Sequence, residues 1–342
     1  MGELWAQLQV MGAEAGIPSM GVTTAKPLEP ARTVLPIRKA QGLAASMQFT
    51  YRNPERSTDP TRALPSAASI VVAAWPYART TPASDGTEIA GRVAMYAWRD
   101  HYGDLQRALE RVAELLRTAG YEAQVHLDDN HLVDRNVAYR AGLGWYGKNA
   151  NLLLPEMGSW FVLGSIVTDA PLESTGPPLA DGCGPCRRCI DDCPTEAIVS
   201  PGVIDARRCL AWLVQGPGEI PVEFRAAVGD RIYGCDDCQD VCPPNAAQAD
   251  GPAAEPDADP EIDVLWILEA SDEDLMTRVG RWYIAKRDPD VVRRTALVIL
   301  GNTGSADDEA VRSTLERYRT CGNELLEEHA EWAATELGLA TG

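Results

Sequence analysis

The first 175 residues alternate between two hydrophobic patterns, the spaced apolar positions of a helix face and the continuous apolar run of a buried strand. The longest expected helix runs from a predicted N-cap at Asp104 to Ala119, with Leu105 and Leu109 on its apolar face. Strands that alternate with helices predict an α/β sandwich over residues 1–175. The expected helices are residues 1–20, 104–119 and 132–141, and the expected strands are residues 69–75, 122–127, 152–154 and 160–167.

The pattern changes after residue 175. A link rich in proline and glycine at 171–182 leads into a cysteine region, and residues 246–260 read as a surface loop. The remainder is expected to be helical, and its segment 291–302 resembles one helix of an α-solenoid repeat. Because one or two such repeats cannot bury their own faces, we expect this part to pack on the rest of the chain. The expected domains are 1–175, 176–250 and 251–342, with C-terminal helices near 291–302, 307–319 and 323–337.

Composition and charge narrow the function classes. A chain of 342 residues with 45% hydrophobic and 24% charged residues suits two or three globular domains. No apolar run approaches the roughly 18 residues of a membrane span, so no membrane partner is expected. The first residues lack an export signal, and we therefore expect a cytoplasmic protein. The net charge of −19 counts against a nucleic-acid role, so any RNA partner has to meet a local basic patch.

Eight of the nine cysteines fall in two runs, and their spacing predicts iron–sulfur chemistry. The first run, C-x2-C-x2-C-x3-C-P, is that of bacterial ferredoxins, whose fourth cysteine binds the neighbouring 4Fe-4S cluster. Two-residue gaps let a tight loop aim three thiolates at one cube, while the fourth thiolate points at the other. The predicted ligands are Cys183, Cys186, Cys189 and Cys242 for one cluster, and Cys193, Cys209, Cys235 and Cys238 for the other.

Two other interpretations compete for these cysteines. Zinc ribbons use C-x2-C pairs, but not this series followed by proline. Disulfides would need an oxidising compartment, and no export signal is present. The ninth cysteine, Cys321, is expected to be a packing residue on a helix. Two clusters indicate electron transfer, and the roughly 180 residues before them leave room for a second cofactor.

Several sequence blocks resemble the epoxyqueuosine reductase family, and together they cover nearly the whole chain. They lie at residues 59–65, 128, 140–149, 158–164 and 229–239, beside the first cysteine run. The resemblance implies a nitroreductase-like α/β domain that holds base-off cobalamin, a double-cluster ferredoxin domain, and HEAT-like helices that help to hold tRNA. It also implies reduction of epoxyqueuosine to queuosine at the wobble position, with electrons passing from the clusters to cobalt.

Asp128 aligns with the proton donor of that family. It closes an apolar strand, where a carboxyl at the edge of a sheet can face a cofactor and be desolvated. Desolvation raises the pKa of a carboxyl and keeps its proton available. The simpler alternative is that Asp128 or Asp129 caps the next helix. The resemblance favours the acid.

The same resemblance places corrin contacts at Arg56, Ala94, Leu152, Leu163 and Asp236, together with Asp128. Arg56 would meet a propionamide or the tail phosphate, whereas the two leucines would touch the corrin through their backbone. The glycine-rich stretch at 142–148 lacks P-loop spacing and is interpreted as a turn closely approaching a large planar ligand. Neither His101 nor His131 has a partner at metal-binding spacing, so no axial histidine is expected.

Three functions remain in view. The first is epoxyqueuosine reductase acting on a tRNA anticodon stem-loop, supplied with electrons by a donor such as flavodoxin or ferredoxin, in a monomeric protein. The second is a related cobalamin reductase acting on a small molecule, and the third is an iron–sulfur electron-transfer protein without catalysis. If RNA binds, we expect Arg293 and Arg294 to contribute.

Overall fold

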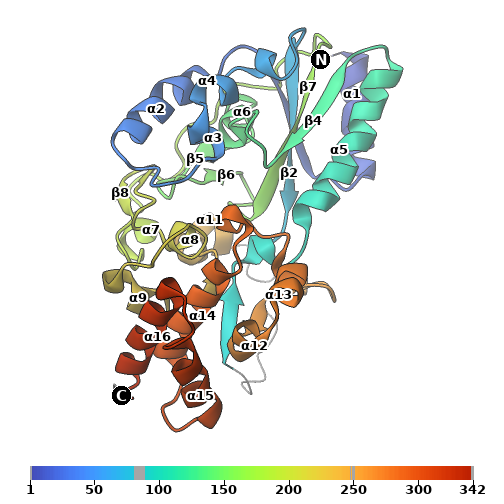
Figure 1. Cartoon of the computed structure of the whole chain (residues 1–342). Helices are drawn as coiled ribbons and strands as arrows, with labels where there is room; N and C mark the ends of the chain where they lie inside the picture. Colours follow the sequence, from blue (N-terminus) through green and yellow to red (C-terminus); the bar gives the residue numbers. More distant parts are fainter. Residues whose placement is uncertain (1, 81–88, 247, 249–250, 340–342) are drawn as a thin grey trace.

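An antiparallel sheet of four strands forms the centre of the N-terminal part (Figure 1). The computed structural model describes residues 2–80, 89–246, 248 and 251–339. The strand order is β1 (Ser19–Thr24), β2 (Ser69–Pro76), β7 (Phe161–Thr168) and β4 (Ala123–Leu127). Strand β7 is buried along its whole length, as its continuous apolar sequence predicts.

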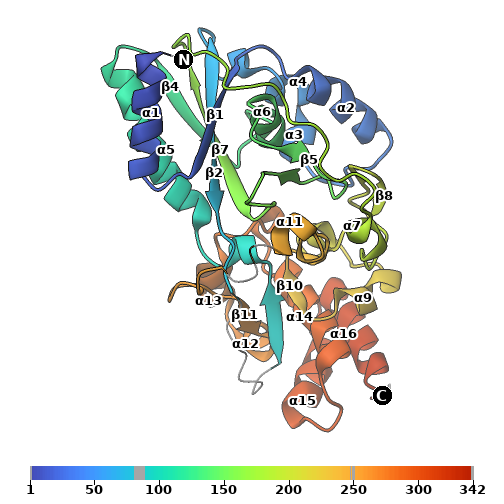
Figure 2. The same cartoon turned by 180° about the vertical axis from the view of Figure 1, so that it is seen from behind.

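Helices cover both faces of this sheet, so the expected α/β sandwich is observed (Figures 1 and 2). Helices α1 (Glu3–Glu14) and α5 (His101–Thr118) pack on one face. Helices α2 (Glu29–Ala40) and α6 (Asp134–Arg140) pack on the other.

The start of α5 differs from the expectation. The cap is Asp100, whose carboxylate accepts the Gly103 backbone N–H at 2.9 Å. Asp104 lies in the first turn and forms ion pairs with Arg99 and Arg107 instead. The sequence pattern missed this turn because His101 and Tyr102 do not continue the apolar spacing that marks the rest of the helix.

A second sheet joins segments that are distant in the sequence. Strand β3 (Ala90–Val93) lies between β10 (Arg231–Tyr233) and β11 (Glu261–Asp263). Residues 90–93 lie inside the range expected for the first domain, yet they pair with strands from the two later ranges. The first element of the C-terminal range is strand β11, whereas the sequence predicted a helix there.

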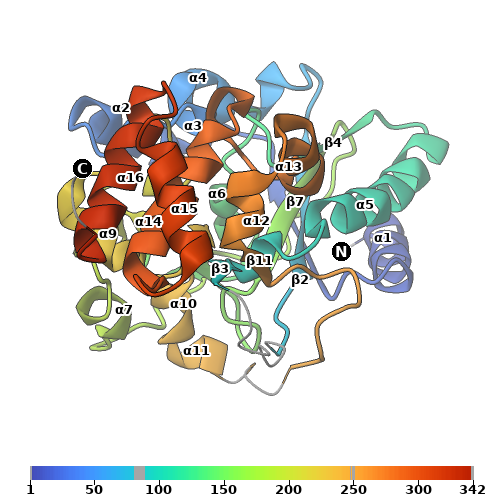
Figure 3. The same cartoon turned by 60° about the horizontal axis from the view of Figure 1, so that its bottom comes forward.

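The C-terminal helices pack around α14 (Asp290–Thr303), and α16 (Glu324–Glu336) lies alongside it (Figure 3). Their core is shared with β3, β10 and the segment between Cys209 and Cys235, which agrees with the expectation that these helices cannot stand alone. The remaining helices of this part are α12 (Val264–Glu269), α13 (Asp272–Val279) and α15 (Glu309–Tyr318).

Two expectations for this C-terminal part are wrong. Cys321 is exposed in the turn between α15 and α16 and does not pack in a core. Arg293 and Arg294 are 9% and 1% exposed, so neither side chain presents a cation to RNA. Every residue of the central helix from Val291 to Gly301 is buried, because α14 is enclosed by its neighbours rather than facing solvent on one side.

Short elements complete the fold. The helices are α3 (Phe49–Arg52), α4 (Pro54–Ser57), α7 (Arg188–Asp191), α8 (Leu210–Leu213), α9 (Val222–Val228), α10 (Asp237–Asp240) and α11 (Pro243–Ala246). The strands are β5 (Trp145–Tyr146), β6 (Leu152–Leu153), β8 (Ile198–Ser200) and β9 (Val203–Ile204). Among the residues described, no helix combines the length and the apolar character that a membrane span requires.

Candidate active site

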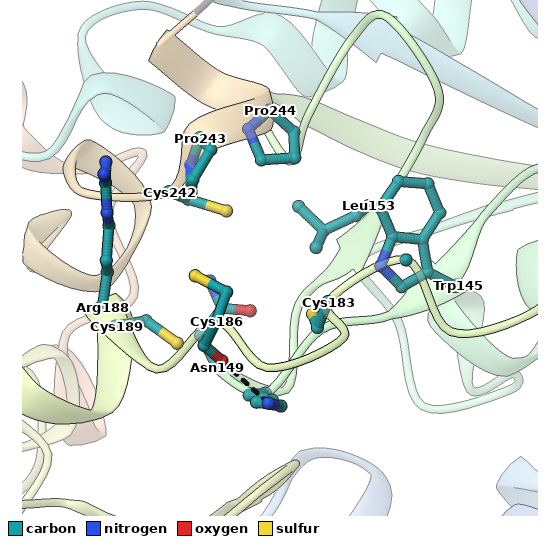
Figure 4. Close-up of a pocket in the computed structure, with 12 residues that line it drawn as sticks. Trp145, Asn149, Leu153, Cys183, Cys186, Arg188, Cys189, Cys242, Pro243 and Pro244 are labelled. Atoms are coloured by element: carbon teal, nitrogen blue, oxygen red, sulfur yellow. Dashed lines mark hydrogen bonds between the residues drawn. The ribbon is translucent and has the colours of Figure 1, made fainter.

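Four cysteines of the predicted first set line one pocket. Cys183 and Cys186 come from the loop that leads into α7, Cys189 lies in α7, and Cys242 lies between α10 and α11 (Figure 4). Burial, and then the charges of the neighbouring cysteines, raise the pKa of the Cys242 thiol to about 11. Thiolates this crowded would repel one another strongly unless cations lay between them, so the pocket suits a group that supplies iron.

The second predicted set lines a separate pocket. Its cysteines are Cys193, Cys209, Cys235 and Cys238. Burial raises the pKa of Cys209, Cys235 and Cys238, with neighbouring thiols adding to the effect. The structure thus brings together Cys209 and Cys235, which are far apart in the sequence, and it crosses Cys193 and Cys242 between the two runs as the ferredoxin spacing predicts.

The glycine-rich segment 142–149 ties the N-terminal part to both cysteine loops. Lys148 Nζ donates to the carbonyls of Gly184 and Cys186 at 2.6 and 2.8 Å, and Asn149 Nδ2 donates to the Cys238 carbonyl at 3.1 Å. A side chain at Gly144 would lie 2.1 Å from the Leu153 carbonyl oxygen. The close approach that requires glycine there is therefore to strand β6 of the protein, whereas the sequence suggested a ligand.

One end of the central sheet faces the second cysteine run. Strand β4 finishes at Leu127, which pairs with Gly164 of β7, so Asp128 follows directly at this end. Just before β7, the Ser159 hydroxyl bonds to Gln239 Oε1 at 2.9 Å. Asp128 and the second cysteine run are thus anchored at the same end of the sheet.

Asp128 has the electrostatics of an acid. Burial, and then the charge of Asp129, raise the pKa of its carboxyl to about 6. The side chain is nevertheless exposed, so a substrate can reach it. Helix α6 begins at Asp134 after Val133, which makes no side-chain cap, so neither Asp128 nor Asp129 plays the capping role that was the alternative.

Further titratable groups surround Asp128. The charge of Asp128 raises the pKa of Tyr102 on α5 and of Tyr233 on β10, although burial is the larger cause for both. Burial also raises the pKa of Asp134, and Asp129 and Asp128 add to that effect. Sequence reasoning did not assign either tyrosine, yet Tyr233 lies inside the quoted block 229–239, which was the available signal.

The other predicted corrin contacts fall into three places. Asp236 Oδ2 accepts the Met95 backbone N–H at 2.7 Å, which puts Asp236 next to Ala94, and burial raises its pKa to about 6. Leu152 and Leu163 belong to the buried core on the α2 and α6 side of the sheet. Arg56 is exposed, and its guanidinium contacts Nε2 of His131.

His131 also belongs to a cluster that the sequence did not reveal. The ligand-type atoms of His126, Asp129 and His131 all lie within 4.8 Å of one another. The spacing of His126 and His131 gave no signal because a turn, rather than a helix or strand, brings them together. The backbone of this turn is in a conformation that residues other than glycine rarely adopt, because the φ of Asp128 is +45°.

Family models match two segments of the chain. Residues 57–129 match a model described as epoxyqueuosine reductase QueG, and residues 182–245 match one described as a 4Fe-4S double cluster binding domain. The second match confirms the prediction of two 4Fe-4S clusters and removes the zinc and disulfide interpretations. The first includes Asp128.

Whole-chain relatives agree with these matches. An epoxyqueuosine reductase of Xanthomonas campestris is 34% identical over 98% of this chain and 96% of its own length. The Escherichia coli epoxyqueuosine reductase is 31% identical over 97% of this chain and 89% of its own length.

Solved structures show the same fold. An epoxyqueuosine reductase crystallised with an epoxyqueuosine-modified tRNA stem-loop superposes with a TM-score of 0.88 at 30% identity, covering 98% of this chain and 90% of that one. A Bacillus subtilis epoxyqueuosine reductase, with its catalytic loop swung out of the active site, also gives 0.88 at 29% identity, with coverage of 98% and 90%. On the relatives that match nearly its full length, this chain belongs to the epoxyqueuosine reductase family.

Proposed function

We propose that this protein reduces epoxyqueuosine to queuosine at the wobble position of tRNA, using cobalamin and two 4Fe-4S clusters. The observation that carries the proposal is a carboxyl of raised pKa, Asp128, at the end of the sheet from which Ser159 binds the second cysteine run. The relative crystallised with a modified tRNA stem-loop supports the substrate. Turnover of an epoxyqueuosine-containing anticodon stem-loop by the reconstituted protein tests it directly.

The chemistry requires an acid. Removal of the epoxide oxygen breaks both of its C–O bonds, consumes two electrons and two protons, and releases water. When bound, cobalamin and the clusters supply the electrons. Asp128 would donate a proton to the leaving oxygen, since its raised pKa keeps part of the population protonated near neutral pH.

The residues of the site fit these cofactors. The eight cysteines in two pockets would hold the clusters. Asp236 and the neighbouring Ala94, near the second cysteine run, would help to hold cobalamin, which the family resemblance implies to be base-off. Leu152 and Leu163 are buried and would offer only their backbone. Arg56 would reach a propionamide or the tail phosphate only by leaving His131.

The wider assignments follow from the same family. We infer a nitroreductase-like domain over 1–175, a ferredoxin-like domain over 176–250 and a HEAT-like part over 251–342, with β3 contributing to the last. We also infer a monomeric, cytoplasmic enzyme that receives electrons from flavodoxin or ferredoxin. A small-molecule substrate is the second candidate, favoured by the net charge of −19.

A locally basic segment could bind tRNA despite the negative net charge of the whole chain. The segment from residue 27 to 65, which contains α2, α3 and α4, has six basic and three acidic side chains, and therefore a net charge of +3. The three helices pack against one another, so the cations that they carry lie on neighbouring elements. We assign the tRNA backbone to this basic segment, in place of Arg293 and Arg294. The basic residues are Arg32, Arg38, Lys39, Arg52, Arg56 and Arg62.

Replacing Arg52 with alanine is expected to weaken binding of the tRNA stem-loop and to reduce the slope of log affinity against log salt by about one. Arg52 is exposed and belongs to the basic segment. Arg107→Ala is the matched control, because Arg107 is exposed on α5, on the opposite face of the sheet. Equal salt slopes for wild type and Arg52→Ala would move the tRNA elsewhere.

Iron content tests the cysteine grouping. Anaerobic wild-type protein is expected to hold about eight irons per chain. The double variants Cys183→Ala/Cys186→Ala and Cys235→Ala/Cys238→Ala should each hold about four, because each removes ligands from one pocket only. Cys321→Ser should keep the wild-type content, since Cys321 lies exposed and away from both pockets.

The crossed ligands can be tested on the second double variant. Adding Cys193→Ala to Cys235→Ala/Cys238→Ala should leave the iron content unchanged, because Cys193 lines the pocket that is already emptied. Adding Cys242→Ala instead should disrupt the remaining cluster. The opposite pattern would show that each run binds its own cluster.

A further inference from the structure

The turn that carries Asp128 is held by a hydrogen-bonded cluster around Asp129. Asp129 Oδ1 accepts the His131 backbone N–H at 2.7 Å, and Oδ2 lies 2.8 Å from His126 Nδ1. His131 Nδ1 lies 3.1 Å from the same Oδ2. One carboxylate thus joins the end of strand β4 to the far side of the turn, spanning Asp128.

Arg56 completes the cluster from a different element. Its guanidinium, on α4, contacts Nε2 of His131. A guanidinium only donates, so Nε2 must be the acceptor and the imidazole proton sits on Nδ1, facing Asp129. The His131 ring makes no hydrogen bond through Nδ1, so its 3.1 Å approach to Asp129 Oδ2 is an electrostatic contact, and the two imidazole rings lie with centroids 4.7 Å apart.

Asp128 needs such support. Its φ of +45° lies in the left-handed region, which costs free energy for a residue other than glycine and persists only where the surroundings hold it. Within the described chain, Val133 caps α6 without a side-chain bond, so the helix start does not fix the turn. The carboxylate of Asp129 is the group whose bonds bracket the strained residue.

We propose that Asp129 is a positioning residue, which through His126, His131 and Arg56 holds the turn so that the carboxyl of Asp128 faces the substrate. The proposal deepens the proposed function and rests on it. Asp129 acts in a second way through its charge. Bonds to the two histidines lower the pKa of Asp129, although burial opposes them, so it stays ionised, and its negative charge helps to keep Asp128 protonated.

Other charged and titratable groups face Asp128 as well. They are Asp134 from α6, Tyr102 from α5 and Tyr233 from β10. None of these spans the turn, and each tyrosine is neutral at ordinary pH because burial raises its pKa. Asp129 is thus the neighbour that combines a fixed negative charge with bonds on both sides of Asp128.

The same three side chains resemble a two-histidine, one-carboxylate metal site, which is the competing reading. Two features favour the hydrogen-bonded cluster. The carboxylate oxygens already receive donors, and the Arg56 cation occupies Nε2 of His131. A metal ion would have to compete with these bonds beside a fixed positive charge.

The experiment compares Asp129→Asn with Asp129→Ala in the reconstituted holoenzyme. Asparagine keeps an acceptor for the His131 N–H but loses the charge, whereas alanine loses both. Asp129→Asn should shift the alkaline fall of kcat to lower pH by about one unit, with KM for the stem-loop unchanged. Asp129→Ala should show the same shift and, in addition, about tenfold faster amide exchange over residues 127–133.

Asp169→Asn is the matched control, because Asp169 accepts the Glu122 N–H at 2.8 Å at the opposite end of β4. It should leave both the pH profile and the exchange of residues 127–133 at wild-type values. An unchanged profile and unchanged exchange in both Asp129 variants would overturn the proposal. So would one equivalent of a metal other than iron and cobalt in wild type that Asp129→Asn loses, since the cluster would then be a metal site.

Failure of the proposed function is distinguishable from failure of this inference. If wild-type protein does not turn over epoxyqueuosine, the proposed function is wrong, while the exchange of residues 127–133 still reports whether Asp129 holds the turn. If wild type is active and both variants match it in every readout, the inference alone is wrong.

Discussion

Replacing Asp128 with asparagine is expected to lower kcat by about 10²- to 10⁴-fold, the range that general acid catalysis usually supplies. Asparagine has nearly the same shape but carries no proton that it can give up. Because Asp128 lies outside both cysteine pockets, the variant should keep its iron content. It should also keep its affinity for cobalamin, because asparagine preserves the shape of the side chain at this expected corrin contact. Single-turnover rates with a modified stem-loop, alongside iron and cobalamin assays, measure both halves of the expectation.

The pH profile provides the control for this variant. Burial and the charge of Asp129 raise the pKa of Asp128 to about 6, so the proton-donating form dominates below pH 6 and decreases above it. Wild-type kcat should therefore fall about tenfold per pH unit above that value, once proton donation limits the rate. Asp128→Asn should lack this fall. A variant with full activity and the wild-type profile would exclude Asp128 as the acid.

The cysteine sites were predictable because the short spacings between cysteines determine which thiols lie close together. Gaps of two residues fix three thiols on one loop, and the proline after Cys193 and Cys242 marks the crossing to the other run. The long interval between Cys209 and Cys235 did not obscure the pattern, since the structure returns Cys209 to the same pocket. The central strands were equally legible, because continuous apolar runs such as β7 are buried on both faces.

The features that sequence reasoning missed depend on tertiary contacts. Strand β3 is too short for its sequence to predict which strands it pairs with, and only the fold brings it between β10 and β11. The cluster of His126, Asp129 and His131 is created by a turn whose left-handed residue is an aspartate rather than the glycine that would have signalled it. The capping alternative for Asp128 was likewise settled by where α6 begins, which the sequence left uncertain by several residues.

The burial of the two arginines of α14 could not be predicted from the sequence either, and it changes where tRNA is expected to bind. Adjacent arginines on a helix are normally solvated, and the sequence offered no reason to expect otherwise. In the structure Arg294 is 1% exposed, and Arg293 forms ion pairs with Asp272 and Asp290. A cation used to hold the protein together is not available to bind phosphate.

Arg294→Ala is therefore expected to destabilise the protein by about 3 kcal/mol, without a direct effect on tRNA affinity. Its guanidinium donates to the carbonyls of Leu213 and Gly216 at 2.6 and 2.8 Å and also contacts the Gly218 carbonyl. Burial and nearby Arg225 lower its pKa only to about 10, so it is charged at neutral pH. Alanine would leave these carbonyls without their donor.

The destabilisation should be felt first in the segment that follows α8. Because Cys209 caps that helix, loosening of residues 213–218 should also speed the loss of iron from the second pocket. The midpoint of thermal unfolding of the iron-loaded protein should shift down by about 4 °C, with half of the iron released earlier than the rest. Arg312→Ala, which removes a more exposed ion pair with Glu309 on α15, should cost less than about 1 kcal/mol. Weaker tRNA binding by Arg294→Ala at unchanged stability would contradict this account, because it would require a buried cation to act at the surface.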